Sequence, residues 1–232
     1  MRKKARKSAA WEWTKSLIIA GAIVLFVRHF LFQNFKVPTG SMEDTILVGD
    51  FLFANKMLYG PTIPFTYHRI FQIRDPHRND VFVFRYPLRP RVAYIKRCVA
   101  VAGDTVEIRN KVLYINGVAQ EEPWARHTDW RVYEGVTRES IPQYQQLWES
   151  GQFIRAGTQI RDNFGPVVVP EGTVFAMGDN RDNSHDSRYW GPLDDRLVLG
   201  KALFLYWSWK KDVPFYRLWE KIRWNRLGRL IK

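Results

Sequence analysis

The stretch Asp80-Val81-Phe82-Val83-Phe84-Arg85-Tyr86 decides the fold class, because its β-branched and aromatic residues predict a strand. Residues 92–101 have the same character and predict a second strand. Further strands are predicted at residues 105–109, 111–115, 167–169 and 173–177, with a tight turn at Asn116-Gly117. No long helix-period stretch occurs between Phe51 and Ser208. The body is therefore predicted to be mainly β, a curled or partly closed antiparallel β-sheet system.

Residues 120–165 differ in character from the strands on either side of them. They are mostly polar and contain scattered tryptophans, and their apolar residues are only weakly periodic. They include Pro123 and Pro142. A structureless loop of that length would be unusual in a compact domain. We therefore expect an insertion that folds as a cap subdomain on the β body.

The composition limits the classes of function. The 232 residues suffice for one substantial domain with an anchor, and the formal charge of +13 favours acidic partners, either nucleic acid or an anionic membrane surface. The single cysteine, Cys98, excludes an intramolecular disulfide. The five histidines show no HExxH spacing, which argues against a zinc enzyme, and we expect no metal and no cofactor.

The N-terminus indicates a membrane anchor. Five basic residues within positions 2–7 precede an apolar run at residues 16–27, and Arg28 and His29 separate this run from Phe30-Leu31-Phe32. The run alone is shorter than the ~18–20 residues of a spanning helix, but interfacial aromatics and a snorkelling Arg28 extend it. A cleaved signal peptide is the alternative. Because no small-residue cleavage site closes the run, we favour a retained signal anchor at residues 11–33. The basic flank at residues 1–10 then predicts a cytoplasmic N-terminus and a translocated body.

The C-terminal residues 209–232 are basic and aromatic. Leu218, Trp219 and Ile222 follow Phe215 at helical spacing. An amphipathic helix lying in a membrane interface fits this pattern. A terminal helix docked on the body is the alternative. A nucleic-acid-binding tail is disfavoured, because this part should lie outside the cytoplasm.

Two separated segments carry candidate chemistry. Pro38-Thr39-Gly40-Ser41-Met42 places a small hydroxyl in a glycine-containing turn after the anchor, and Tyr94-Ile95-Lys96-Arg97-Cys98-Val99 places a lysine in an apolar strand. A serine hydroxyl needs a base, and a lysine can serve only when it is neutral. Its pKa of ~10.4 falls when apolar neighbours exclude water. Strand alternation should give Lys96 a mainly apolar face, and should turn Arg97 to the opposite face, where it reaches solvent.

Taken singly, each of these features has an ordinary explanation. A serine after glycine is usually a turn residue, and a lone strand lysine usually extends to water. A third segment, Gly178-Asp179-Asn180-Arg181-Asp182-Asn183-Ser184-His185-Asp186-Ser187-Arg188, adds a polar scaffold. Serine, lysine and scaffold together favour acyl transfer at a membrane surface.

Together these residues resemble the type I signal peptidases, membrane-bound serine proteases with a Ser–Lys dyad that remove signal peptides from exported proteins. The resemblance covers most of the chain, including the anchor, Gly40-Ser41-Met42, Lys96-Arg97 and residues 178–188. Its most specific part is the pattern Gly-Asp-Asn-x-x-x-Ser-x-Asp-Ser-Arg, which is hard to meet by chance.

The resemblance implies roles for the residues of the first two segments. Ser41 would be the nucleophile and Lys96 the general base. Thr39 would help the Ser41 backbone N–H to form an oxyanion hole. Met42 would lie in the substrate-binding turn.

The resemblance also implies supporting roles in the third segment. Ser184 would orient the lysine amine by a hydrogen bond. Asp186 and Arg188 would form an ion pair behind the site, and Asp179 would support it. One departure from the family pattern is Asp44, which stands where the family usually has proline and places a charge near the rim of the cleft.

The implied substrates are exported preproteins that bind as extended strands and are cleaved after small residues at the −1 and −3 positions. Further partners would be the lipid bilayer and the protein export machinery, with no nucleic acid. The implied location is the bacterial inner membrane, with a single pass and the catalytic domain on the periplasmic face. That domain would comprise residues 34–119 and 166–208, joined by the insertion at 120–165 and followed by the tail at 209–232.

Three alternatives stay open. A Ser–His–Asp triad would use Ser41, His185 and a nearby aspartate. A self-cleaving Ser–Lys repressor should carry a DNA-binding domain, where this chain has an anchor. A non-catalytic, membrane-anchored β protein would use the basic tail as a scaffold, but it would have no need of a buried lysine.

Overall fold

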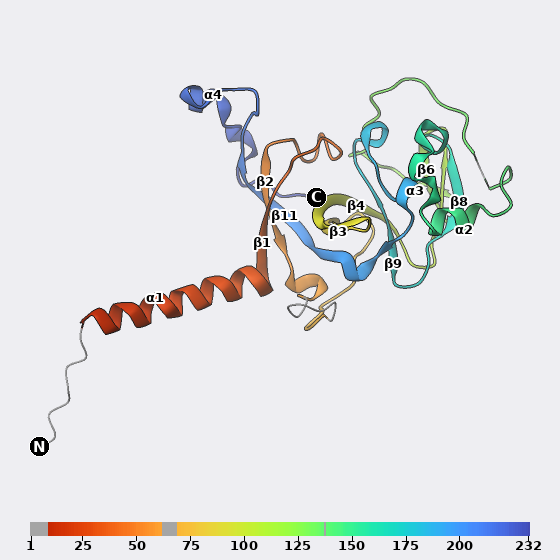
Figure 1. The fold of residues 1–232 in the computed structure, drawn as a ribbon. Helices are drawn as coiled ribbons and strands as arrows, with labels where there is room; N and C mark the ends of the chain where they lie inside the picture. Colours follow the sequence, from red (N-terminus) through yellow and green to blue (C-terminus); the bar gives the residue numbers. More distant parts are fainter. Residues whose placement is uncertain (1–8, 62–68, 137) are drawn as a thin grey trace, which may run out of the picture.

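The computed structural model describes residues 9–61, 69–136 and 138–232. Helix α1 (Ala9–Phe26) continues through a π-helical turn, η1 (Val27–Leu31), and stands clear of a β-rich body (Figure 1). The helical stretch Trp11–Leu31 is long and apolar enough to cross a membrane, with a mean hydropathy of 1.6. The segment predicted as an anchor, residues 11–33, is thus helical to Leu31, and a strand begins at the next residue.

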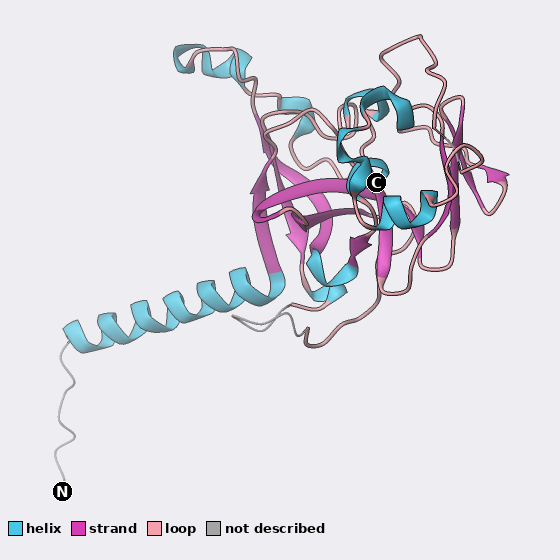
Figure 2. Ribbon diagram, turned by 45° about the vertical axis from the view of Figure 1, so that its right-hand side comes forward, coloured by secondary structure: helices cyan, strands magenta, loops and turns pink. Residues whose placement is uncertain are grey.

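The described residues of the body form two antiparallel sheets (Figure 2). The larger sheet has the order β1-β2-β11-β3-β4-β9-β10 and is built from β1 (Phe32–Lys36), β2 (Asp50–Asn55), β3 (Val81–Tyr86), β4 (Arg89–Val101), β9 (Thr173–Met177), β10 (Leu193–Asp194) and β11 (Val198–Ser208). The smaller sheet has the order β7-β6-β5-β8 and is built from β5 (Thr105–Arg109), β6 (Val112–Ile115), β7 (Val118–Ala119) and β8 (Phe164–Val168). The prediction of a mainly β, antiparallel fold is confirmed, and across the described residues neither sheet closes on itself.

In the described residues of the body the helices are short. They are α2 (Tyr144–Glu149), α3 (Ser187–Trp190) and α4 (Leu218–Lys221), with 3-10 turns η2 (Met57–Tyr59), η3 (Gln152–Arg155), η4 (Gly157–Ile160), η5 (Arg181–Asn183), η6 (Asp195–Leu197), η7 (Phe215–Arg217) and η8 (Trp224–Arg226). Among them, η5 and α3 belong to the segment that the sequence singled out as a polar scaffold.

Strand β3 is buried on both faces, and this fixes the centre of the larger sheet. Val81 and Val83 pack in one apolar cluster, whereas Phe82 and Phe84 pack in another on the opposite face. Full burial of such a side chain stabilises the fold by about 1.5–3 kcal/mol. β4 pairs along β3, and its consecutive residues from Lys96 to Ala100 are buried as well, so the middle of β4 is also covered on both faces.

Residues 120–165 pack against the smaller sheet. Trp148 of α2 is fully buried and stacks on Phe175 of β9, with 5.6 Å between the ring centroids. Tyr144 and Phe164 complete this aromatic cluster. The apolar residues of the insertion therefore share a core with the body, and its boundaries as a cap subdomain stay a prediction.

The C-terminal tail returns to the larger sheet. Ile222 forms a bridge with Trp209 and is buried. The helical part is limited to η7 and the four residues of α4, so the helix expected from Phe215 onward is little more than a turn long. Trp219 and Tyr216 are 78% and 87% exposed, on a projection from the body that Figure 1 labels α4.

Candidate active site

The chain between β1 and β2 forms the turn that carries Ser41. The Val37 N–H donates to the Asp50 carbonyl oxygen at 2.9 Å, which closes the base of the turn. Met42 and Ile46 bury their side chains in the core, at 1% and 0% exposed. Because its neighbours are fixed in this way, Ser41 is held at the wall of a cleft.

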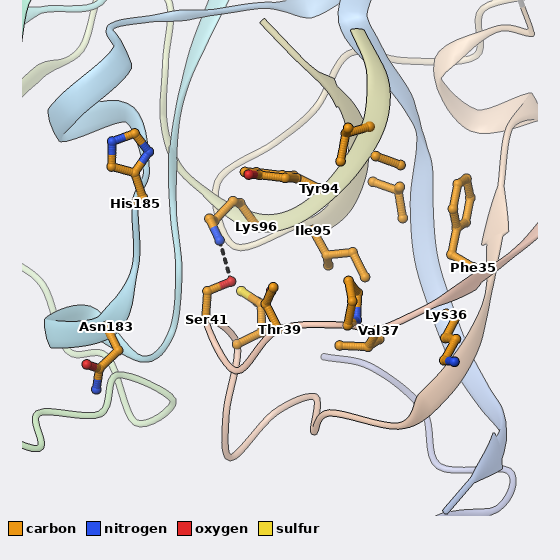
Figure 3. A pocket seen from close by; sticks show the side chains of 15 residues that line it. Phe35, Lys36, Val37, Thr39, Ser41, Tyr94, Ile95, Lys96, Asn183 and His185 are labelled. Carbon is orange, nitrogen blue, oxygen red and sulfur yellow. Dashed lines mark hydrogen bonds between the residues drawn. The ribbon is translucent and has the colours of Figure 1, made fainter. Parts of the chain in front are cut away.

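Lys96 faces Ser41 from the middle of β4. It lies opposite Phe82 in the strand register and is 2% exposed. Its Nζ is hydrogen-bonded to Ser41 Oγ at 2.5 Å, as Figure 3 shows. Serine and lysine, 55 residues apart in the sequence, are thus brought into direct contact.

Burial changes the protonation of this lysine. Loss of water contact lowers the pKa of Lys96 to about 8, although the negative charges of Asp186 and Asp179 partly oppose the change. At pH 7 about one molecule in ten would then carry a neutral amine, against well under one in a thousand for an ordinary lysine. The geometry and the protonation together suit a base for the Ser41 hydroxyl.

The cleft around this pair has a volume of about 390 Å³. Its side nearest β1 is mainly apolar, whereas Asn183 and His185 line it beyond the Ser41–Lys96 pair (Figure 3). Thr39 and Met42, both predicted site residues, line the cleft beside Ser41.

Asp186 and Arg188 form a buried ion pair behind the lysine. Arg188 donates through Nε to Oδ1 at 2.8 Å and through Nη2 to Oδ2 at 2.9 Å, and both side chains are at most 1% exposed. Burial, the largest single cause, would raise the pKa of Asp186, but the charge and hydrogen bond of Arg188, with smaller contributions from Ser184 and Lys96, together hold the pKa below its usual range. Asp186 also accepts from the Gly178 N–H at 3.2 Å, so the pair fixes both ends of the third segment.

Asp179 forms a second buried ion pair, with Arg97. The prediction that Arg97 reaches solvent is wrong, because the guanidinium is 0% exposed and donates to both Asp179 oxygens at 2.9 and 2.7 Å. The alternation along β4 does turn Arg97 away from Lys96. The opposite face is covered, however, by the third segment and by the Trp124 ring, whose centroid lies 4.2 Å from the guanidinium carbon.

Asn180 contributes to the site although the sequence analysis assigned it no role. Its N–H donates to the Ser41 carbonyl oxygen at 3.1 Å, and its Nδ2 donates to the Gly40 carbonyl oxygen, also at 3.1 Å. The residue therefore holds the Ser41 turn against the third segment. Its position in the Gly178-Asp179-Asn180 motif was the signal that could have identified it.

Ser184 is buried against Gly178, and its expected hydrogen bond to Lys96 is not formed. Its Oγ is buried and makes no hydrogen bond of ordinary geometry within the described residues, although the hydroxyl is close enough to the Asp186 carboxylate to help lower the pKa of that group. Gly178 leaves room for it, because a Cβ there would collide with Ser184 Oγ and with the Ser41 carbonyl oxygen. The role of Ser184 in orienting Lys96 stays a prediction.

His185 does not contact Ser41. Its ring stacks on Tyr189, with 5.0 Å between the ring centroids, and no hydrogen bond joins it to Ser41 in the part of the chain that the structure describes. The geometry therefore favours the lysine over the histidine as partner of the serine. No group of three or more described His, Cys, Asp or Glu side chains is arranged to hold a metal ion.

Comparisons with known proteins cover most of the chain. The family model "Signal peptidase, peptidase S26" matches residues 10–207. A signal peptidase I of Pseudomonas aeruginosa is 39% identical over 212 residues, covering 85% of this chain and 72% of that protein. A signal peptidase I of Pseudomonas fluorescens is 38% identical over 240 residues, covering 95% and 79%. A crystal structure of a signal peptidase I from Enterococcus faecalis matches 55% of this chain and 97% of its own, with 30% identity and a TM-score of 0.39.

Proposed function

The chain belongs to the signal peptidase family, peptidase S26, whose reaction is the removal of signal peptides, and we propose that Ser41 is its nucleophile and Lys96 its general base. The observation that carries this proposal is the 2.5 Å contact between Lys96 Nζ and Ser41 Oγ, made by a buried lysine whose pKa is lowered to about 8.

The reaction begins with proton transfer. Neutral Lys96 takes the hydroxyl proton while Ser41 Oγ attacks the scissile carbonyl carbon of the bound preprotein. The ammonium then gives this proton to the leaving amine, and the mature protein departs. Lys96, neutral again, activates the water that hydrolyses the acyl-enzyme.

The oxyanion of each tetrahedral intermediate needs donors that are already in place. The Ser41 N–H and the Thr39 hydroxyl are proposed for this role, since both lie at the cleft wall beside the nucleophile. Asn180 supports them by holding the carbonyl groups of Gly40 and Ser41.

The substrate is proposed to bind as an added strand. β4 pairs with β3 through residues 89–97, but with β9 only from Arg97 onward. In the described part of the chain, residues 92–95 thus present one edge without a strand partner, and they line the cleft. A peptide can form main-chain hydrogen bonds to such an edge. Its −1 and −3 side chains would then point the same way, toward the apolar wall of the cleft, where small side chains are proposed to bind.

The membrane provides the setting for this reaction. We propose that α1 and η1 form a retained single-pass anchor in the bacterial inner membrane, with the basic N-terminus in the cytoplasm and the body on the periplasmic face. The exposed aromatic residues Tyr216 and Trp219 would contact lipid at the interface. Preproteins, the bilayer and the export machinery are the proposed partners, and nucleic acid is not.

The proposal is tested by cleavage of a preprotein with an Ala-x-Ala site. Detergent-solubilised protein is compared with Ser41→Ala and Lys96→Ala, and the products are mapped by mass. Ser150→Ala and Lys211→Ala are matched controls, because both residues are exposed and neither lines the cleft. We expect cleavage after the second alanine, lost in the first two variants only. Absence of cleavage of several preproteins by the wild-type protein would favour a scaffold, and cleavage by Lys96→Ala would show that the base is another group.

A further inference from the structure

His185 and Asn183 line the cleft but take no part in the Ser41–Lys96 pair. Both side chains are exposed. Figure 3 shows them on one side of the pair, while Phe35 and Lys36 lie on the other. The cleft therefore extends past the reacting atoms in two directions.

The two directions differ in their relation to the anchor. Phe35 belongs to β1, which starts directly after the last helical residue of the anchor, Leu31. A signal peptide is the apolar N-terminal part of a preprotein and remains with the membrane. The residues that precede the scissile bond are therefore expected on the Phe35 side. The residues that follow it, the first of the mature protein, should leave past His185 and Asn183.

The His185 ring is held in place while its nitrogens stay available. Its plane lies 21° from that of the Tyr189 ring, with 5.0 Å between the centroids, and the His185 carbonyl oxygen accepts from Trp190 Nε1 at 3.3 Å. Within the described residues neither ring nitrogen has a hydrogen-bond partner. A fixed ring with free polar edges can hydrogen-bond to a substrate side chain at low cost in entropy.

Asn183 adds a second polar group at this end. Its Nδ2 donates to Thr128 Oγ1 at 3.0 Å and to Asn180 Oδ1 at 3.2 Å. Both amide hydrogens are thereby used, and Oδ1 remains as an acceptor. The exit side of the cleft is thus polar, in contrast to the apolar side that leads to β1.

We propose that His185 and Asn183 bind the first residues of the mature protein, and that His185 selects side chains able to hydrogen-bond over apolar side chains of similar size. This inference rests on the proposed signal-peptide cleavage and adds to it a determinant on the mature side of the scissile bond. His185 is then a specificity residue, which explains its place in the cleft without a contact to Ser41.

The test uses two preproteins that differ only in the first mature residue, glutamine in one and leucine in the other. The kcat/KM of the full-length protein is measured for each. We expect glutamine to be preferred by about fivefold, the size of one net hydrogen bond. His185→Ala should abolish the preference and His185→Gln should keep it. His77→Ala, a change at an exposed histidine outside the cleft, should leave it unaltered.

The outcomes separate this inference from the function on which it rests. Cleavage of both preproteins with equal kcat/KM by the wild-type protein would overturn the role of His185 and leave the peptidase intact. A preference that survives His185→Ala would do the same. Failure of the wild-type protein to cleave either preprotein would overturn both proposals.

Discussion

Asp179 pairs with Arg97, the residue next to Lys96, and both side chains are fully buried. The same carboxylate accepts from the Thr45 hydroxyl at 2.6 Å, at the end of the turn that begins with Ser41. The Asp179 carboxylate therefore links β4, which carries Lys96, to the turn that carries Ser41. We expect the 2.5 Å contact between Lys96 Nζ and Ser41 Oγ to depend on this connection.

Asp179→Asn should disturb this connection and leave the Arg97 charge buried without a counter-charge. Removal of one partner from a buried pair costs about 3–5 kcal/mol. We expect a lower unfolding temperature and a kcat that falls more than KM rises. Asp194→Asn is the matched control. Its ion pair with Arg196 is largely exposed and should contribute less than about 1 kcal/mol to the free energy of unfolding. Equal effects of the two substitutions would contradict the connecting role.

The Asp186–Arg188 ion pair should contribute to the free energy of unfolding. Arg188→Met leaves a buried carboxylate unpaired, and we expect a loss of about 3–5 kcal/mol in the free energy of unfolding. The double variant Arg188→Met/Asp186→Leu should recover part of that loss, because neither charge of this pair remains. Thermal unfolding of the solubilised proteins measures both, and a double variant less stable than the single one would refute the explanation.

The same pair predicts a direction for the pH dependence of stability. Because the folded pKa of Asp186 lies below its usual value, its stabilising contribution is present above the unfolded pKa of ~3.9 and is lost as pH falls through the folded value. The wild-type protein should therefore lose stability on acidification more steeply than the double variant. Parallel curves of unfolding temperature against pH would show that Asp186 is not linked in this way.

Gly178→Ala tests the packing behind the nucleophile. Since a Cβ would overlap both the Ser41 carbonyl oxygen and Ser184 Oγ, the backbone must move. We expect kcat to fall by at least about tenfold, as a displacement of the serine by a fraction of an ångström is enough for this. Gly21→Ala, at a glycine of α1 with open space around it, is the comparison for activity. Unchanged kcat in Gly178→Ala would mean that the turn tolerates the shift.

Lys96→Arg separates the base from a merely positive charge. Arginine stays protonated in proteins and cannot accept the serine proton. The rate of cleavage should fall by at least about a thousandfold. A loss of this size is within the rate enhancement that general acid–base catalysis supplies. The unfolding temperature serves as the check on folding. Retention of substantial cleavage would indicate that electrostatic attraction, and not proton transfer, is the role of Lys96.

The strands around the site could be predicted from the sequence where the pattern was local. Residues 80–86, 105–109 and 173–177 contain β-branched and aromatic residues, and each corresponds to a strand. The contact of Ser41 with Lys96 was also anticipated, but only through a resemblance in three distant segments. Ser41 and Lys96 are 55 positions apart, and no local sequence pattern predicts a contact over that separation.

Other features depend on tertiary packing that the sequence pattern does not contain. Phe32 continues the apolar pattern of the anchor in the sequence. In the structure it starts β1, because Asn55 of β2 pairs with it. The alternation that turns Arg97 away from Lys96 was predicted, but the burial of its charge was not. That burial requires Asp179, which lies 82 residues further along the chain.

The pH dependence of kcat/KM tests the central claim most directly, namely that a neutral Lys96 deprotonates Ser41. This quantity reports ionisations of the free enzyme. Since the base must be neutral, kcat/KM should rise about tenfold per pH unit at low pH and level off above a midpoint near 8, the lowered pKa of Lys96. A midpoint close to 6.5, typical of histidine, or one close to the ordinary lysine value of 10.5, would contradict the claim.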